Sequence, residues 1–335
     1  MVYFHHFNPF SNPGTLGFRF FAEFHIGVTL FFVLSGFIIT HKYFLNRTVP
    51  LSVYFWNRFT KIYPVFLFLT LLTFLIQAVY FNGFGERESL TLLVNLLLLK
   101  GYFSDYLFTG IAQAWTLTVE ETFYLLAPLL AVSWRKLRWP ILVLPVVLVC
   151  LGLLIRYLFH DLFPFGFMGD LQFLFNFTFF GRCFEFLLGM GLAYSLHQSF
   201  KPKHMTIFGA VCIFLSLMAL ALIGKEGKTG DNFPLGIVIN NFALPLFGIV
   251  PLFWGLIQEE TWLKKLLSSR LFRILGDSSY VFYLIHIGIF QLALATLGFS
   301  IYINLLLLYT AAIFGFYFFE HPLKVFLRSR FYQRS

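Results

Sequence analysis

The chain has 335 residues, of which 59% are hydrophobic and only 12% are charged, and its mean hydropathy is +0.80. Soluble domains carry about 25% charged residues, so this composition excludes a water-soluble globular protein and predicts an integral membrane protein. The net charge of +9 does not indicate a nucleic-acid-binding protein, because the basic residues gather on one side of the predicted spans.

Apolar stretches follow one another along the whole chain. A membrane-spanning helix needs about 20 mostly apolar residues, and nine stretches qualify: residues 24–44, 64–82, 115–133, 139–158, 173–197, 205–224, 235–257, 279–298 and 301–320. The run 89–99 is too short to cross and is interpreted as interfacial or re-entrant. The chain opens on MVYFHHFNPF, which resembles the end of a helix. We therefore predict an all-α transmembrane bundle in one domain, residues 1–335, with nine full spans and a truncated first helix.

The lysines and arginines predict the orientation. Alternating the spans across the membrane places 17 of the 24 on one side and 7 on the other. The richer side is expected to be cytoplasmic, which puts the C-terminus inside. The three cysteines, at 150, 183 and 212, lie inside apolar runs and are interpreted as small buried residues; their spacing predicts no disulfide framework and no metal site.

Two stretches near the N-terminus could carry chemistry. Histidine can take a proton from a hydroxyl near neutral pH, so His5 and His6 are candidate general bases. The alternative is a polar pair at the membrane surface. Further on, Ser35 and Gly36 are small enough to let another helix approach closely.

Arg58, Lys61 and Tyr63 lie where the second span is predicted to begin. Their guanidinium and ammonium groups could bind the phosphates of coenzyme A at the cytoplasmic mouth. Ordinary anchoring of an inner helix end by basic and aromatic residues accounts for them equally well.

The segment 115–128, WTLTVEETFYLLAP, places two acids within an apolar stretch. Acids at membrane depth are costly and commonly functional. Glu120 shares a helix face with Tyr124, whereas Glu121 lies about 100° round the helix. We therefore expect one acid to face a polar cavity and the other to pair with Arg182 or a histidine. The alternative is that the acids form a purely structural ion pair. Trp115 is a further candidate, either for binding the acceptor or for a structural polar contact.

Later spans carry three more candidate groups. Arg182 and Glu185 are three residues apart and could neutralise each other. Tyr283 and His286 share a helix face, where His286 could be either catalytic or a satisfied structural histidine. Asp277 or Ser278 could cap this helix at its N-terminus. Glu320 is expected to be a local anchor or a partner for a base on the inner side.

Four runs together resemble the acyltransferase-3 family of integral membrane acyltransferases, which O-acetylate cell-envelope sugars. The runs are HIGVTLFFVLSGFIIT, RFTKIYP, AWTLTVEETFYLLAP, and LGDSSYVFYLIH with the terminal FFEHPL, and they extend from about residue 25 to 323. The resemblance implies ten spans, an acyl-CoA donor taken from the cytoplasm, and an acceptor hydroxyl on a polysaccharide or glycolipid outside. It further implies a bacterial inner-membrane location.

The resemblance also implies a catalytic histidine at the end of the first helix, eleven residues after an arginine. His6 is chosen over His5 because Phe7 follows it, while the arginine has no counterpart in this sequence. Glu120 would orient the imidazolium or position the acceptor. The donated group could be acetyl or succinyl, and no metal is implied. The alternatives are a transporter or flippase, and a family member that is inactive because the first helix is short.

Overall fold

The computed structural model describes residues 1–45, 49–80, 85–196, 202–225 and 227–332, with the side chains of residues 86 and 332 left out. The ends of two predicted spans, at residues 81–82 and 197, lie outside this part. The chain divides into two compact units. Unit 1 comprises Met1–Thr48 and Val119–Leu266, and unit 2 comprises Val49–Thr118 and Leu267–Ser335. Every regular element in the described ranges is helical, as predicted.

The helices of unit 1 include most of the candidate residues. They are α1 (Val2–His6), α2 (Leu16–Ala22), α3 (Gly27–Ile39), α6 (Trp115–Lys136, whose first turn belongs to unit 2), α7 (Pro140–Phe159), α8 (Leu171–Phe177), α9 (Phe179–Ser195), α10 (Met205–Ile223), α11 (Pro234–Val238), α12 (Val250–Gln258) and α13 (Trp262–Leu267). A 3₁₀ turn, Glu23–Ile26, joins α2 to α3, and a π-helical segment, Ile239–Ile249, joins α11 to α12.

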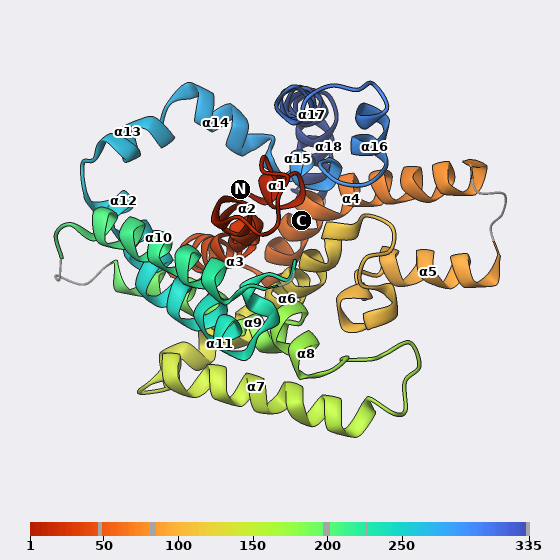
Figure 1. Ribbon diagram of the computed structural model, residues 1–335. Coiled ribbons are helices and arrows are strands. Elements are labelled where there is room, and N and C mark those ends of the chain that lie inside the picture. Colours follow the sequence, from red (N-terminus) through yellow and green to blue (C-terminus); the bar gives the residue numbers. More distant parts are fainter. Residues whose placement is uncertain (46–48, 81–84, 197–201, 226, 333–335) are drawn as a thin grey trace. The chain divides into compact units, whose positions relative to one another are not determined.

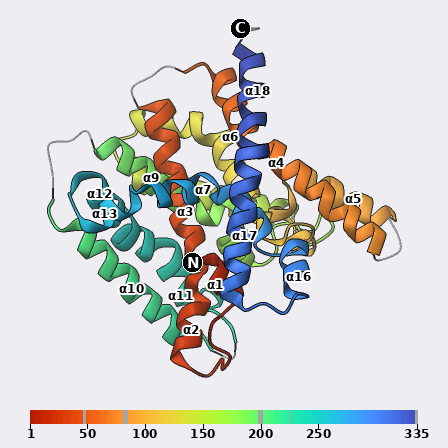
Figure 2. The same ribbon diagram turned by 90° about the horizontal axis from the view of Figure 1, so that it is seen from above.

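Unit 2 contains the remaining helices. They are α4 (Leu51–Tyr80), α5 (Glu86–Leu96), α14 (Arg270–Asp277), α15 (Ser279–Ile285), α16 (Ile289–Ala295), α17 (Ile301–Gly315) and α18 (His321–Tyr332). Short 3₁₀ turns lie between α5 and α6, and the π-helical segment Phe316–Glu320 joins α17 to α18. Figure 2 shows α17 and α18 as one long helix.

Within the described residues, seven helices are long and apolar enough to cross a membrane, rather than the nine predicted. They cover Leu16–Phe44, Leu51–Tyr80, Pro140–Phe159, Leu171–Ser195, Met205–Ile223, Pro234–Gln258 and Ile301–Phe331. The predicted span 115–133 does form a 22-residue helix, but its acids and threonines lower its hydropathy. The short run 89–99 corresponds to α5, which has 11 residues.

The predicted span 279–298 is not one helix. It is divided into α15 and α16, of 7 residues each, and Gly288 lies between them with φ +86°. Only glycine adopts such a backbone conformation readily. The apolar composition of this stretch gave no indication of the break. Similarly, α4 begins at Leu51, so Arg58 and Lys61 lie inside the helix and not at its start.

Contacts within unit 1 agree with spans that alternate in direction. At one end, the Glu23 side chain accepts a hydrogen bond from the backbone N–H of Gly230, and the Asn176 amide donates to the carbonyl of Asp231. At the other end of α3, the Arg135 guanidinium donates to the carbonyl of Phe44. The Glu23–Ile26 turn, which precedes α3, therefore lies at the same end of unit 1 as Gly230 and Asp231.

Helix α9 is the centre of unit 1, with α3 packed on one side and α7 on the other (Figure 1). A Cβ added at Gly36 would lie 2.1 Å from the carbonyl oxygen of Phe186, and one added at Gly189 would lie 2.0 Å from that of Val33. The expected close helix approach at Ser35–Gly36 is thus confirmed.

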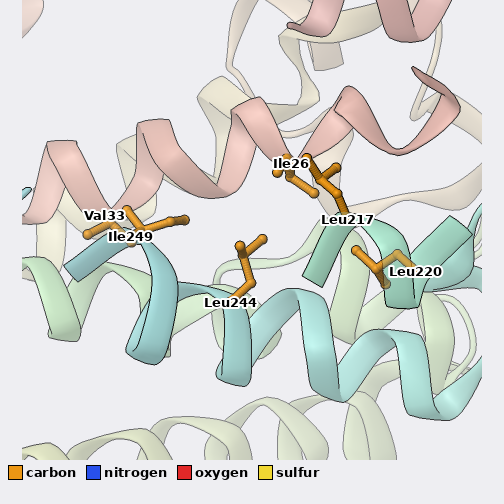
Figure 3. Close-up of a cluster of buried hydrophobic side chains, with 6 residues drawn as sticks. All are labelled: Ile26, Val33, Leu217, Leu220, Leu244 and Ile249. Atoms are coloured by element: carbon orange, nitrogen blue, oxygen red, sulfur yellow. The ribbon is translucent and has the colours of Figure 1, made fainter. Parts of the chain in front are cut away.

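A second part of the core joins α3 to α10 and the π-helical segment. Ile26 and Val33 face a layer formed by the side chains Leu217, Leu220, Leu244 and Ile249 (Figure 3). This packing places the Glu23–Ile26 turn against α10. It therefore holds the residues just before α3 in place next to the loop that follows α10.

Candidate active site

The structure distinguishes the two adjacent histidines. His5 is partly buried, and its Nδ1 lies 2.5 Å from the carbonyl oxygen of Ala22, whereas His6 is exposed. Because a carbonyl oxygen can only accept, Nδ1 of His5 carries the proton in this hydrogen bond. The Nε2 atom of a neutral His5 therefore holds the lone pair that a general base needs.

Three ionisable side chains gather beside His5. The ring of His25 packs against that of His5, with 5.4 Å between centroids. One nitrogen of His25, Nε2, lies 3.3 Å from Oδ2 of Asp231, and the other, Nδ1, lies 3.7 Å from Oε2 of Glu23. We call Glu23, His25 and Asp231 the outer cluster. Neither Glu23 nor Asp231 was predicted from the sequence, although an acid two residues from a histidine at the start of an apolar span is a usable signal.

The surroundings of His5 favour its neutral form. Burial and the neighbouring His25 lower the pKa of His5 to about 4, although the Ala22 carbonyl and Asp231 act in the opposite direction. The Asp231 carboxyl behaves differently. Burial would raise its pKa, but His25 and the hydroxyl of Thr229 outweigh burial and hold that pKa below its ordinary value.

A buried polar network lies deeper in unit 1. Arg182 forms the predicted pair with Glu185, with 2.7 Å from Nη2 to Oε1 and 2.9 Å from Nε to Oε2. The same guanidinium donates to the hydroxyl of Thr29 at 2.9 Å, and this hydroxyl donates to Oδ1 of Asn240. The side-chain contacts of Arg182 are thus with Glu185 and Thr29, whereas the sequence had suggested Arg182 or a histidine as the partner of one of the two acids in segment 115–128.

Glu120 is buried, as expected for an acid that faces a polar interior. Its carboxylate accepts hydrogen bonds from the hydroxyl of Ser35 at 2.7 Å and from that of Tyr124. Ser35 follows His25 by ten residues, a helical rise of about 15 Å, so the contacts of Glu120 lie far along α3 from the outer cluster. Glu121 is only partly buried, in agreement with its predicted position on a different face.

In unit 2, the basic residues of α4 are partly committed to other partners. The Lys61 ammonium lies 2.7 Å from Oε1 of Glu320, which confirms the expectation that Glu320 is a partner for a basic side chain. The Tyr63 hydroxyl donates to the carbonyl of Leu96. Arg58 is partly buried on the same helix. These contacts are compatible with both predicted roles, anchoring and binding of an anion.

The polar residues around α15 also bond to their own unit. The hydroxyl of Tyr283 lies 2.7 Å from that of Thr116, one residue after the partly buried Trp115. Nδ1 of the buried His286 lies 2.7 Å from the carbonyl of Tyr283, a contact that is compatible with both the structural and the catalytic interpretation. Ser278 is the N-cap residue of α15, as predicted, but its hydroxyl makes no capping bond and donates back to the carbonyls of Ile274 and Leu275.

Comparison with known proteins adds the family. The model of the acyltransferase-3 family, described as an acyltransferase domain, matches residues 1–319. The chain belongs to this family. The described residues include seven helices long and apolar enough to cross a membrane. Together with the family membership, they indicate that the chain is an integral membrane protein.

Individual relatives are more distant. A Staphylococcus aureus (strain COL) protein provisionally named an O-acetyltransferase is 23% identical over 294 residues, which are 79% of this chain and 46% of that protein. Nodulation protein 10 of Rhizobium leguminosarum bv. viciae is 31% identical over 130 residues, 34% of each chain. The match thus spans half or less of the length of these curated relatives, and no solved structure matches the chain.

Proposed function

We propose that this acyltransferase-3 chain moves an acyl group, acetyl above all, from acyl-CoA to a hydroxyl of a cell-envelope polysaccharide or glycolipid, with Nε2 of His5 as the general base. The observation that carries the proposal is the hydrogen bond between Nδ1 of His5 and the Ala22 carbonyl. It fixes the tautomer whose Nε2 can accept a proton. The provisional O-acetyltransferase name of the S. aureus relative supports the reaction class.

The proposed reaction is a direct transfer. Nε2 of His5 takes the proton of the acceptor hydroxyl while the hydroxyl oxygen attacks the thioester carbonyl and forms a new ester bond. The bond from carbonyl carbon to sulfur breaks, and the CoA thiolate takes the proton back from the imidazolium. His5 is therefore regenerated in each cycle, and no acyl-enzyme is required.

The orientation supports an acceptor on the outer side. The chain end that contains His5 shares one end of unit 1 with the 224–233 loop, and the distribution of lysine and arginine assigns this end to the outside. On the donor side, Arg58, Lys61 and Tyr63 stay the proposed contacts for the CoA phosphates. Lys61 contributes less free charge than predicted, because Glu320 already neutralises it.

The test uses bacterial membranes that contain the full chain and radiolabelled acetyl-CoA. We expect release of the CoA thiol to rise together with alkali-labile label in the glycan and glycolipid fractions, above membranes without the chain. Label that crosses the membrane without thiol release would indicate transport and would contradict the proposal. Thiol release that yields no labelled carbohydrate would contradict the proposed acceptor class.

A further inference from the structure

We propose that the outer cluster, Glu23, His25 and Asp231, is a binding site for a divalent transition-metal cation. One ligand atom from each of the three side chains lies within 4.8 Å of the others. Imidazole and carboxylate groups together are the donors that Zn²⁺ and its neighbours in the first transition row prefer, whereas Mg²⁺ and Ca²⁺ favour oxygen alone. The inference rests on these three residues and not on the proposed acyl transfer.

Each carboxylate is held by one oxygen and leaves the other for a ligand. The backbone N–H of Gly230 donates to Oε1 of Glu23 at 2.7 Å, and the hydroxyl of Thr229 donates to Oδ1 of Asp231 at 2.5 Å. Oε2 of Glu23 and Oδ2 of Asp231 remain, and both approach His25. In known metal sites, a hydrogen bond to the second oxygen of a carboxylate ligand orients that ligand toward the metal.

The histidine is arranged in the same way. Nδ1 of His25 lies 3.4 Å from the carbonyl of Ala22, which can only accept, so Nδ1 carries the proton and Nε2 is available as a ligand. Two buried atoms of the cluster, Oε2 of Glu23 and Nε2 of His25, have no hydrogen-bond partner. Glu23 is 1% exposed, and a buried carboxylate oxygen without a donor is costly. A cation would satisfy both atoms at once.

The charges of the neighbourhood leave room for a cation. Arg182, the basic side chain of the buried network, is already paired with Glu185. The guanidinium of Arg19 donates to the carbonyl of Gly224 at 3.5 Å. Neither arginine forms an ion pair with Glu23 or Asp231 among the described residues. Three protein ligands leave a further coordination position for water or a substrate oxygen, which is the pattern of an open site and not of a closed structural one.

The test measures metal content directly. The full chain, purified in detergent, is loaded with Zn²⁺, passed over a desalting column and analysed by mass spectrometry for bound metal. We expect one Zn²⁺ for each chain in the wild type and in Glu260→Gln, a control in which the replaced carboxylate is exposed. Asp231→Asn and His25→Gln should retain less than a tenth of this amount.

A spectroscopic readout guards against loss by misfolding. Co²⁺ bound to the wild type should show visible d–d absorption, and Thr229→Val, which keeps all three ligands, should weaken Co²⁺ binding about 10- to 100-fold. Wild-type protein that retains no Zn²⁺ or Co²⁺ would overturn the proposal and leave the outer cluster as a set of side-chain contacts without a cation. Retention at the wild-type level by Asp231→Asn and His25→Gln would overturn it equally.

Discussion

The buried pair of Arg182 and Glu185 allows the sharpest test of the structure of unit 1. Arg182 is 3% exposed and Glu185 is not exposed at all, and the two make two charged contacts of 2.7 and 2.9 Å. Replacing Arg182 with Met keeps an apolar chain of similar length but leaves the carboxylate without its cation. Loss of one member of a buried ion pair costs about 3–5 kcal/mol in the free energy of unfolding.

The double variant Arg182→Met/Glu185→Leu separates the charge from the packing. With both charges removed, the site is apolar, and such replacements are often close to neutral. We therefore expect the double variant to be more stable than Arg182→Met by about 2 kcal/mol or more. Equilibrium unfolding in mixed micelles containing SDS gives the free energy of unfolding of the wild type, the single variant and the double variant.

Two outcomes would refute this reasoning. Arg182→Met could match the stability of the wild type, which would mean that Glu185 needs no cation. The double variant could equally be no more stable than the single one, which would mean that the contacts to Thr29 and not the charge pair stabilise the site. Acyl transfer by a stable double variant would further show that the pair is structural.

Three more outcomes follow from single contacts. Gly189→Ala should destabilise unit 1 by about 1–3 kcal/mol, because the added Cβ would lie 2.0 Å from a backbone carbonyl oxygen of α3. In the control Gly191→Ala the added Cβ would lie 3.2 Å from a side chain, so this variant should unfold at nearly the same midpoint as the wild type. Equal unfolding midpoints for the two variants would contradict the tight contact at Gly189. Burial lowers the pKa of Lys100 to about 7, so unfolding takes up a proton between that pH and roughly 10.4 and stability rises with pH. Lys100→Met should therefore reduce the increase of melting temperature with pH. An unchanged increase would show that other groups cause the pH dependence. Tyr283→Phe removes hydroxyl contacts of 2.7 and 2.9 Å and should cost about 1 kcal/mol in unfolding, which an unchanged midpoint would disprove.

The sequence predicted those features that depend on local pattern. Apolar length alone located most of the long helices. The three-residue spacing of Arg182 and Glu185 predicted their pair, and the small residues Ser35 and Gly36 predicted a close helix contact. Each of these depends on neighbours within one helix, which composition and spacing can report.

The features that were missed depend on residues far apart in the sequence. Glu120 finds its partner in Ser35, 85 positions away, and no pattern within either helix specifies that contact. Asp231 reaches His25 because α10 packs on α2 and on the Glu23–Ile26 turn and thereby brings the following loop to the start of α3. The contact of His5 with the carbonyl of Ala22, 17 positions away, likewise could not be predicted from the motif.

The break at Gly288 was missed for a different reason. Residues 279–298 are apolar enough to span, and hydropathy cannot report a residue with φ +86° in the middle of such a stretch. A glycine within an apolar run is compatible with both an intact helix and a break. Only the backbone distinguishes the two.

The assignment of His5 as the general base is tested most directly by comparing His5→Asn with His6→Asn. Both variants remove an imidazole from the same short helix, α1, and the contacts given for the Ala22 carbonyl and the His25 ring are those of His5. Thiol release from acetyl-CoA, measured in membranes at equal protein level, should fall at least about 100-fold for His5→Asn and stay near wild type for His6→Asn. The reverse pattern, or full activity of His5→Asn, would contradict the assignment.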